Sequence, residues 1–242
     1  MTDFSLSITS WYRQNKRNLP WRNTSNPYFI WLSEVILQQT RVDQGTNYYN
    51  KFIKNYPTII HLANASEKDI LNDWQGLGYY SRGRNLHFTA KFICNELKEK
   101  FPNNYKELIK LKGVGDYTAS AIASFAFNEK VAPVDSNVIR VITRFFGIED
   151  DVTNMQVLKH IKEIANQLLP EIETSTYNQG MMEFGALQCK PVSPNCKLCP
   201  LNFKCWAFLN NKISSLPVKN KKIIKKDRFF SLKKVLDFFS QS

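Results

Sequence analysis

Apolar residues recur at helical spacing from the N-terminus to about residue 187, and this periodicity constrains the fold more than any other feature of the sequence. In the first such segment the apolar positions are Phe4, Ile8, Trp11 and Tyr12. No stretch of the sequence alternates apolar and polar residues over the length of a strand and then turns. The sequence therefore predicts an all-α or nearly all-α fold.

Helices are expected wherever this periodicity continues between breakers such as Pro20 and Pro27. The expected helices cover residues 4–15, 28–38, 43–54, 66–73, 81–99, 104–110, 116–126, 135–146, 154–168 and 175–187. Residues 188–210 are rich in Cys and Pro and are expected to be non-helical. Beyond them, SSLPVKNKKIIKKDR has the composition of a basic linker, and the final SLKKVLDFFSQS has the pattern of a short amphipathic helix.

The composition is that of a folded domain with an excess of positive charge. Of the 242 residues, 43% are hydrophobic and 22% are charged, which excludes wholesale disorder. The net charge is +12, of which residues 211–242 contribute +7. Such an excess favours an anionic partner, with nucleic acid the first candidate, although charge alone leaves a solvated basic surface equally open.

The sequence contains no sign of export or membrane insertion. No apolar run approaches the roughly 20 residues of a membrane span, so no membrane partner is expected. The N-terminal MTDFSLSITSWYRQ lacks the basic and apolar regions of a signal peptide. The chain has five Cys, an odd number and unlike a secreted disulfide scaffold. A reducing, cytoplasmic location is therefore expected, and a monomer is the default.

Four Cys lie close together with the spacing C-x6-C-x2-C-x5-C: Cys189, Cys196, Cys199 and Cys205. Thiolates at this density can bind one soft-metal centre. A zinc site favours two C-x2-C pairs, of which there is one here, whereas a [4Fe–4S] cluster also takes four Cys, and disulfides are a third possibility. Cys94 lies in an apolar run and is expected to be buried.

The segment LKGVGDYTASAIASFAF places Gly113, Val114 and Gly115 between two expected helices. The ordinary interpretation is a helix C-cap followed by a tight turn. Glycines also permit positive φ and close backbone approach, and amides at the start of the next helix can then bind a phosphate. This favours a DNA-phosphate contact at these three residues, with Lys112 beside it.

Two carboxylic acids have surroundings that suit catalysis. Glu34 is the only charge between Arg22 and Arg41 and lies among apolar residues, where lost solvation would raise its pKa toward that of a general acid. Asp135 follows Pro133 at an expected helix start. The ordinary alternatives are an exposed Glu on a polar stripe and an Asp that only caps its helix.

Several separated motifs together resemble one family, the helix-hairpin-helix DNA glycosylases. The cysteine spacing, with MMEFGAL and NCKLCPL, is similar to the iron–sulfur loop of the endonuclease III and MutY branches, and L-x-G-V-G-x-x-T-A resembles the hairpin motif. The segments SEVILQQT, V-D-S-N-V-x-R-V, LPWR and W-Q-G-L-G-Y-Y-S-R resemble the MutY branch. The resemblance extends from residue 4 to about residue 230.

The resemblance implies an all-α, two-lobed fold with a C-terminal [4Fe–4S] cluster loop held by the four clustered Cys. Residues 23–132 would form a six-helix barrel with the hairpin motif, and residues 1–22 with 133–210 would form the cluster lobe. Residues 211–242 would be a basic tail, the truncated start of a linker and C-terminal domain. A MutY chain typically continues into a Nudix-like domain that recognises 8-oxoguanine, so the strength of that selectivity is left open.

The implied activity is hydrolysis of the N-glycosidic bond of adenine mispaired with 8-oxoguanine or guanine in double-stranded DNA. Glu34 would protonate adenine N7, Asp135 would stabilise the oxocarbenium ion and Asn137 would orient the catalytic groups. Tyr117 stands where the endonuclease III branch carries the Lys that forms a Schiff base. The resemblance thus implies a monofunctional enzyme.

The resemblance also implies binding roles, because adenine must leave the base stack to expose the scissile bond. Three residues would line the adenine pocket: Trp21, Arg22 and Gln179. Three would meet the base stack or the opposing base: Gln39, Leu77 and Tyr79. Three in the cysteine loop would face DNA phosphates: Lys190, Lys197 and Lys204. Core packing is the alternative for the aromatic and leucine side chains, and ordinary solvation for the lysines.

Two other functions stay open. One is an endonuclease III-like glycosylase and lyase acting on oxidised pyrimidines, which needs an amine nucleophile that Tyr117 does not supply. The other is a catalytically impaired protein that binds DNA in a salt-dependent way and releases no base.

Overall fold

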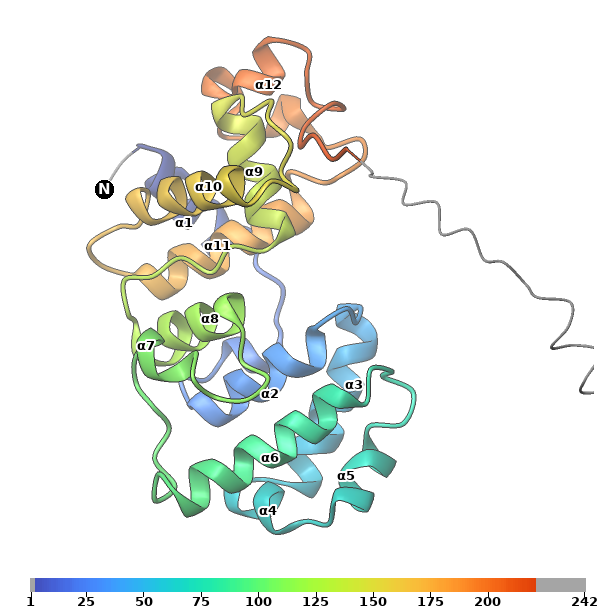
Figure 1. Cartoon of the computed structure of the whole chain (residues 1–242). Helices are drawn as coiled ribbons and strands as arrows, with labels where there is room; N and C mark the ends of the chain where they lie inside the picture. The colour runs from blue at the N-terminus through green and yellow to red at the C-terminus, as the bar shows by residue number, and fades with distance from the viewer. Residues whose placement is uncertain (1–2, 221–242) are drawn as a thin grey trace, which may run out of the picture.

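The structure is a computed structural model that describes residues 3–220. Its regular elements are helices, with no strand in this range, so the prediction of an all-α fold is confirmed (Figure 1). The longer helices are α1 (Asp3–Asn15), α2 (Pro27–Leu37), α3 (Val42–Asn55), α6 (Ser81–Asn95), α8 (Asp116–Phe127), α9 (Ser136–Phe146), α10 (Met155–Gln167) and α11 (Thr174–Leu187). The shorter elements are η1 (Pro20–Arg22), α4 (Ile59–Asn64), α5 (Glu67–Asp73), α7 (Tyr105–Leu108), η2 (Cys196–Leu198), η3 (Asn202–Lys204) and α12 (Trp206–Leu209). Within the described range no helix has both the length and the apolar character needed to cross a membrane.

Local capping explains where several helices begin and end. Asn26 accepts a hydrogen bond from the amide of Tyr28 at the start of α2, and Asp135 caps the start of α9. Helix α9 ends at Gly147, whose φ of 73° lies in the left-handed region that favours glycine. A Cβ at Gly147 would also lie only 2.4 Å from the Trp206 ring. Both ends of α9 are therefore fixed by the residues around them.

Buried apolar side chains form two separate cores. Helices α2–α8 build the first, around side chains such as Trp31, Phe52 and Trp74. Helices α1 and α9–α11 build the second, around Ile8 and Phe184 among others. Burial of a side chain as large as Phe52 contributes about 1.5–3 kcal/mol, so each core can hold its own group of helices together. Figure 1 shows the two groups as a lower and an upper body, with α1 packed beside α11 in the upper one.

Helices α8 and α11 connect the two bodies. The side chain of Asn178 on α11 is 3% exposed and donates hydrogen bonds to Ser124 Oγ and to the Val131 carbonyl, each at 2.8 Å. Because an amide buried at this depth is costly to leave unpaired, these bonds favour one arrangement of α11 against α8.

Each helix predicted from periodicity is present, and all but one end within two residues of their expected bounds. The exception is α6, which was expected to cover residues 81–99 and ends at Asn95. Lys98 and Glu99 adopt φ values of 51° and 64°, which a right-handed helix cannot contain. The Glu99 amide instead bonds the Ile93 carbonyl at 3.0 Å and closes the helix end.

The short elements differ most from the sequence predictions. Helix α4 was not predicted, because six residues are too few to display a period, although its cap Thr58 is a usable signal. The expectation that residues 188–210 are non-helical was wrong where η2, η3 and α12 form single turns. The helix expected in SLKKVLDFFSQS lies outside the described residues.

Candidate active site and cysteine loop

A cavity of about 430 Å³, here called the interlobe cavity, lies between the two bodies. Its walls come from η1, α2, α8, α9 and α11, so both cores support it. Eight of the residues selected from the sequence line it: Trp21, Arg22, Glu34, Gln39, Tyr117, Asp135, Asn137 and Gln179. The fold thus brings together residues from η1 near the N-terminus and from α11 far along the chain.

Glu34 lies on α2 with 7% of its surface exposed, so it is not on a solvated polar stripe. Burial is the main reason that its pKa is raised to about 7, and nearby Asp135 acts in the same direction. A hydrogen bond with Tyr117 and the charge of Arg22 act against this shift. A carboxyl group with this pKa is partly protonated at neutral pH and can therefore donate a proton inside the cavity.

Asp135 caps α9 and lines the cavity as well. One carboxylate oxygen accepts hydrogen bonds from the amides of Asn137 at 2.9 Å and Val138 at 2.8 Å. The other accepts from Asn137 Nδ2 at 2.7 Å. Burial raises its pKa, while these bonds and the charge of Arg140 act against the rise. The capping interpretation is correct, and the capped carboxylate is held at a fixed position on the cavity wall.

Tyr117 contributes a hydroxyl to the same cavity. The hydroxyl donates a hydrogen bond to Met182 Sδ at 3.8 Å, and it also lowers the pKa of Glu34. Burial and the charges of Glu34 and Asp135 raise its pKa well above the ordinary value. Tyr117 is therefore neutral, and no lysine is among the described residues that line the cavity.

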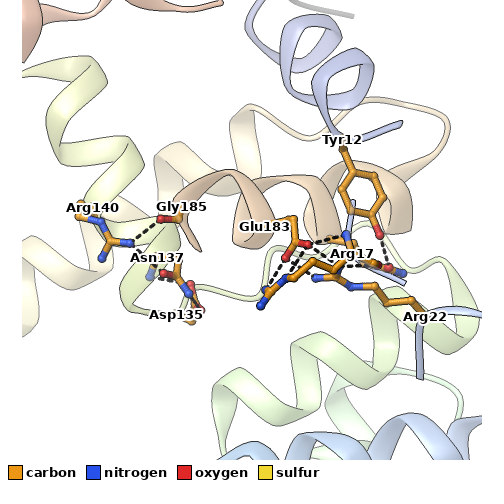
Figure 2. A network of polar contacts seen from close by, with 9 residues as sticks. Tyr12, Arg17, Arg22, Asp135, Asn137, Arg140, Glu183 and Gly185 are labelled. Atoms are coloured by element: carbon orange, nitrogen blue, oxygen red, sulfur yellow. Dashed lines mark hydrogen bonds and ion pairs between the residues drawn. The ribbon is translucent and has the colours of Figure 1, made fainter. Parts of the chain in front are cut away.

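A buried arginine ties Asn137 to the end of α11 and to the cysteine loop, and Figure 2 shows its bonds to Asn137 and Gly185. Arg140 Nη2 donates to Asn137 Oδ1 at 2.8 Å and to the Gly185 carbonyl at 2.7 Å, and Nε donates to the Cys189 carbonyl at 2.8 Å. A Cβ at Gly185 would lie 2.5 Å from that of Asn137, so the close packing of α9 on α11 requires glycine there. Arg140 stands inside the V-D-S-N-V-x-R-V segment but was not predicted as a site residue from it.

A second network on the cavity wall surrounds a fully buried carboxylate (Figure 2). Glu183 accepts hydrogen bonds from Arg17 Nη2 and Arg22 Nη2, each at 2.7 Å, and its side chain has no exposed surface. Burial opposes its ionisation, but the bonds from Arg22 and Arg17 outweigh burial and lower its pKa to about 2. Neither Arg17 nor Glu183 was predicted as a site residue from the sequence. The signal was available, since Glu183 is the only charge between Glu173 and Lys190.

The polar end of Gln179 is also engaged. Its Oε1 accepts a hydrogen bond from the hydroxyl of Tyr12 at 2.8 Å, and its Nε2 donates to Ser175 Oγ at 3.3 Å. Arg22 lies over the Tyr12 ring at 5.7 Å. The cavity therefore presents an amide, a guanidinium and the indole of Trp21 around one space.

Other selected residues lie outside the cavity. Leu77 is 7% exposed and packs in the first core, whereas Tyr79 is 67% exposed with a φ of 43°. The hairpin lies between α7 and α8, where Gly113 has a φ of 80° and little room for a Cβ, which would approach Asn85 Cβ to 2.8 Å. Gly115 caps α8 with extended backbone. The amides at the start of α8 are thus available on the surface.

The four clustered cysteines surround one small apolar pocket, together with side chains such as Phe184 and Leu201. They are free thiols, which excludes the disulfide alternative in this structure. Arg144 Nη1 donates to Cys189 Sγ at 3.5 Å and to the Lys190 carbonyl at 2.7 Å, fixing the entry to the loop. Among the described residues, no three His, Cys, Asp or Glu side chains are arranged to hold a metal ion.

The remaining cysteine and the lysines of this loop have separate environments. Cys94 is half-buried against the first core, away from the other four. Lys190, Lys197 and Lys204 are exposed, and Lys204 Nζ forms an ion pair with Asp3 at 2.9 Å.

A model of the HhH-GPD superfamily of base excision DNA repair proteins matches residues 32–167. The adenine DNA glycosylase of Buchnera aphidicola subsp. Acyrthosiphon pisum is 36% identical, with 96% of this chain and 69% of the relative aligned. That of Buchnera aphidicola subsp. Baizongia pistaciae is 40% identical, with 95% and 66% aligned, and the human one is 41% identical, with 86% and 40% aligned. The chain thus spans about two thirds of the length of these bacterial relatives.

Solved structures share the fold. A thermostable thymine-DNA glycosylase superposes with a TM-score of 0.78 at 31% identity, covering 86% of this chain and 95% of that one. Endonuclease III in a non-covalent DNA complex superposes with a TM-score of 0.73 at 23% identity, covering 86% and 94%.

Proposed function

We propose that this chain, which belongs to the HhH-GPD superfamily of base excision DNA repair proteins, hydrolyses the N-glycosidic bond of adenine mispaired with 8-oxoguanine or guanine in double-stranded DNA. The observation that carries the proposal is the pairing of Glu34 and Asp135 in one interlobe cavity. The names of the relatives support adenine as the base. The protein acts by extruding that adenine into the cavity.

The two carboxyl groups suit the two charges that develop when the bond breaks. As the C1′–N9 bond opens, the base gains negative charge and the sugar gains positive charge. Glu34, with its pKa of about 7, donates its proton to adenine N7. The Asp135 carboxylate faces the oxocarbenium ion, and water then adds its oxygen to C1′ and passes a proton to a carboxylate. Asn137 holds Asp135 in place through the bond at 2.7 Å.

The cavity has the size and lining expected for one base. Its volume of about 430 Å³ falls within the usual range for small-molecule sites. Trp21 offers an aromatic face, and Arg22 and Gln179 offer polar groups for the edge of adenine. The Arg17–Arg22–Glu183 network keeps that wall rigid.

Tyr117 supports a monofunctional reaction. A lyase forms a Schiff base between a lysine amine and C1′, and the phenol of Tyr117 cannot form one. We therefore expect base release that leaves an abasic site, with strand breakage only after alkali.

The DNA is held outside the cavity. The backbone of Gly113, Val114 and Gly115 at the start of α8 binds a phosphate without reading sequence. Gln39 and the exposed Tyr79 enter the base stack, and Leu77 lies near the opposing base. Lys190, Lys197 and Lys204 face phosphates along the cysteine loop. The lobes that close on the duplex are residues 23–132 and residues 1–22 with 133–210.

The four clustered cysteines bind a [4Fe–4S] cluster. All four line one small apolar pocket as free thiols, and four Cys ligands are the set that such a cluster takes. When bound, the cluster would supply four Fe–S bonds that join the two ends of this loop. Arg144 orients Cys189 by donating to its sulfur and to the next carbonyl.

Single-turnover base release tests the proposed activity. Duplexes would carry adenine opposite 8-oxoguanine, guanine or thymine, each with and without alkali, alongside thymine opposite guanine because one similar structure is a thymine-DNA glycosylase. We expect alkali-dependent cleavage at adenine opposite 8-oxoguanine and guanine. Cleavage without alkali would favour a lyase. Release of thymine opposite guanine would favour a thymine-DNA glycosylase. DNA binding without release of any base would favour an impaired DNA-binding protein.

A further inference from the structure

One guanidinium joins two backbone segments that lie far apart in the sequence. Arg82, in the first turn of α6, donates from Nη1 to the carbonyls of Val35 at 3.0 Å, Ile36 at 3.2 Å and Gln38 at 2.7 Å. From Nη2 it donates to the carbonyls of Leu77 at 2.9 Å and Gly78 at 3.4 Å. The first set lies at the end of α2 and the second in the loop that precedes α6.

The end of α2 needs such a donor. The last carbonyls of a helix have no partner within it, and here no glycine follows to close the helix in the usual way. Gln39 instead adopts a φ of 55°, a conformation that a side chain makes unfavourable. A cation at this point satisfies the carbonyls and interacts favourably with the helix dipole.

The second segment, the loop that precedes α6, also contains residues with positive φ. Gly76 and Gly78 have φ values of 95° and 69°, and Tyr79 follows with 43°. Trp74 Nε1 donates to the Gly78 carbonyl at 3.0 Å. Arg82 lies 5.2 Å from the Trp74 ring centre and 5.8 Å from that of Tyr79, so it contacts this loop through rings as well as carbonyls.

We infer that Arg82 is a positioning residue that fixes Gln39 and Tyr79 relative to each other, so that both enter the DNA as one unit during extrusion of the base. The inference rests on the proposed function and adds a residue that touches neither the base nor the interlobe cavity. It also places Glu34 in the same unit, because Arg82 donates a hydrogen bond to the carbonyl of Val35, the residue after Glu34.

Only arginine has the geometry for this role. Its planar fork presents several N–H groups in fixed directions, so one side chain can bond carbonyls of two segments at once. A lysine keeps the charge but presents one ammonium group, which can reach one segment and not hold both. The Arg82→Lys variant therefore separates the fork from the charge.

The test compares Arg82→Lys with Arg84→Lys, a matched change two residues along α6. Arg84 is mostly exposed and lies 3.4 Å from Glu67. Three quantities would be measured: the melting temperature, the fluorescence of 2-aminopurine placed at the target adenine, and single-turnover release of adenine. Fluorescence reports unstacking without base release, so it is informative even if the proposed chemistry is wrong.

For Arg82→Lys we expect a fluorescence rise on binding that is less than half that of the wild type, and at least tenfold slower adenine release. Release should recover to within about threefold of wild type when the target lies opposite an abasic site, where extrusion is easier. Arg84→Lys should match the wild type throughout. The inference is wrong if Arg82→Lys keeps wild-type fluorescence, or if its loss of rate is the same on the abasic-opposed duplex. A wild-type protein that unstacks 2-aminopurine but releases no adenine would overturn the proposed function alone.

Discussion

Tyr117 on α8 and Glu34 on α2 both line the interlobe cavity, and each shifts the pKa of the other. Tyr117 is neutral because burial and the nearby carboxylates raise its pKa well above the ordinary value. As a donor to the ionised carboxylate, it opposes the larger effect of burial on Glu34. One residue thus adjusts the proton affinity of the other across two helices.

This relationship predicts a pH dependence. Only protonated Glu34 can donate its proton, so adenine release should fall as pH rises through about 7, the raised pKa of this group. Tyr117→Phe removes the bond that favours the ionised form, so the fall should move to higher pH. Single-turnover rates measured between about pH 5 and 9 would show this. A decline that begins near the ordinary pKa of a glutamate, or a shift in the other direction for Tyr117→Phe, would contradict the prediction.

The Arg140 network predicts a role for a residue outside the cavity. Arg140→Lys would lose the fork that holds Asn137 Oδ1 and the carbonyls of Gly185 and Cys189. We expect a stability loss of about 1–3 kcal/mol from the buried groups left unpaired, and about tenfold slower release at unchanged DNA affinity. Urea denaturation and single-turnover kinetics would measure both. The matched control is Arg13→Lys, an exposed ion pair, and equal behaviour of the two variants would refute the role.

Glu183 predicts a loss of stability in acid. The pKa of its side chain falls from an ordinary 4.5 to about 2 in the folded protein, so its contribution to stability is complete above about pH 4.5 and is lost as pH falls toward 2. Glu183→Gln leaves two guanidinium groups without their carboxylate and should cost about 3 kcal/mol at pH 7. The variant should also show a smaller stability decrease between pH 5 and pH 3 than the wild type. Denaturation curves at the three pH values test this against the exposed control Glu173→Gln, which should resemble the wild type.

The four cysteines around one pocket lead to a prediction of the iron content of the protein. Purified protein should be brown and contain four irons per chain, as a [4Fe–4S] centre requires. Cys199→Ser should lose iron and become less stable, whereas Cys94→Ser, at a half-buried position in the first core, should retain iron. Elemental analysis and the visible spectrum measure the difference. Stoichiometric zinc without iron in the wild type would contradict the assignment.

Much of the helical framework could be predicted from the sequence, because α1 and α9 carry a helical apolar period, α2 is a long apolar run, and α2 and α9 each follow a capping residue. Short elements could not. Helix α4 has too few residues to show a period, and the end of α6 depends on the left-handed backbone of Lys98 and Glu99, which the sequence does not mark with glycine.

The cavity-lining residues selected by family resemblance, such as Glu34 and Asp135, do meet in one space. The residues missed were those whose function depends on distant backbone. Arg82 and Arg140 bond carbonyls more than 40 positions away, and no pattern along the sequence identifies such partners. Glu183 differs from these two residues, because an isolated charge in an apolar helix can be recognised in the sequence.

In the proposed reaction Glu34 supplies the proton for adenine release, and one substitution tests this role. Single-turnover adenine release from an adenine–guanine duplex would be compared for the wild type and Glu34→Gln, with DNA affinity and melting temperature measured on the same samples. We expect Glu34→Gln to lose at least about 10²-fold in rate, with DNA affinity and folding retained. A Glu34→Gln protein that releases adenine at the wild-type rate would contradict it.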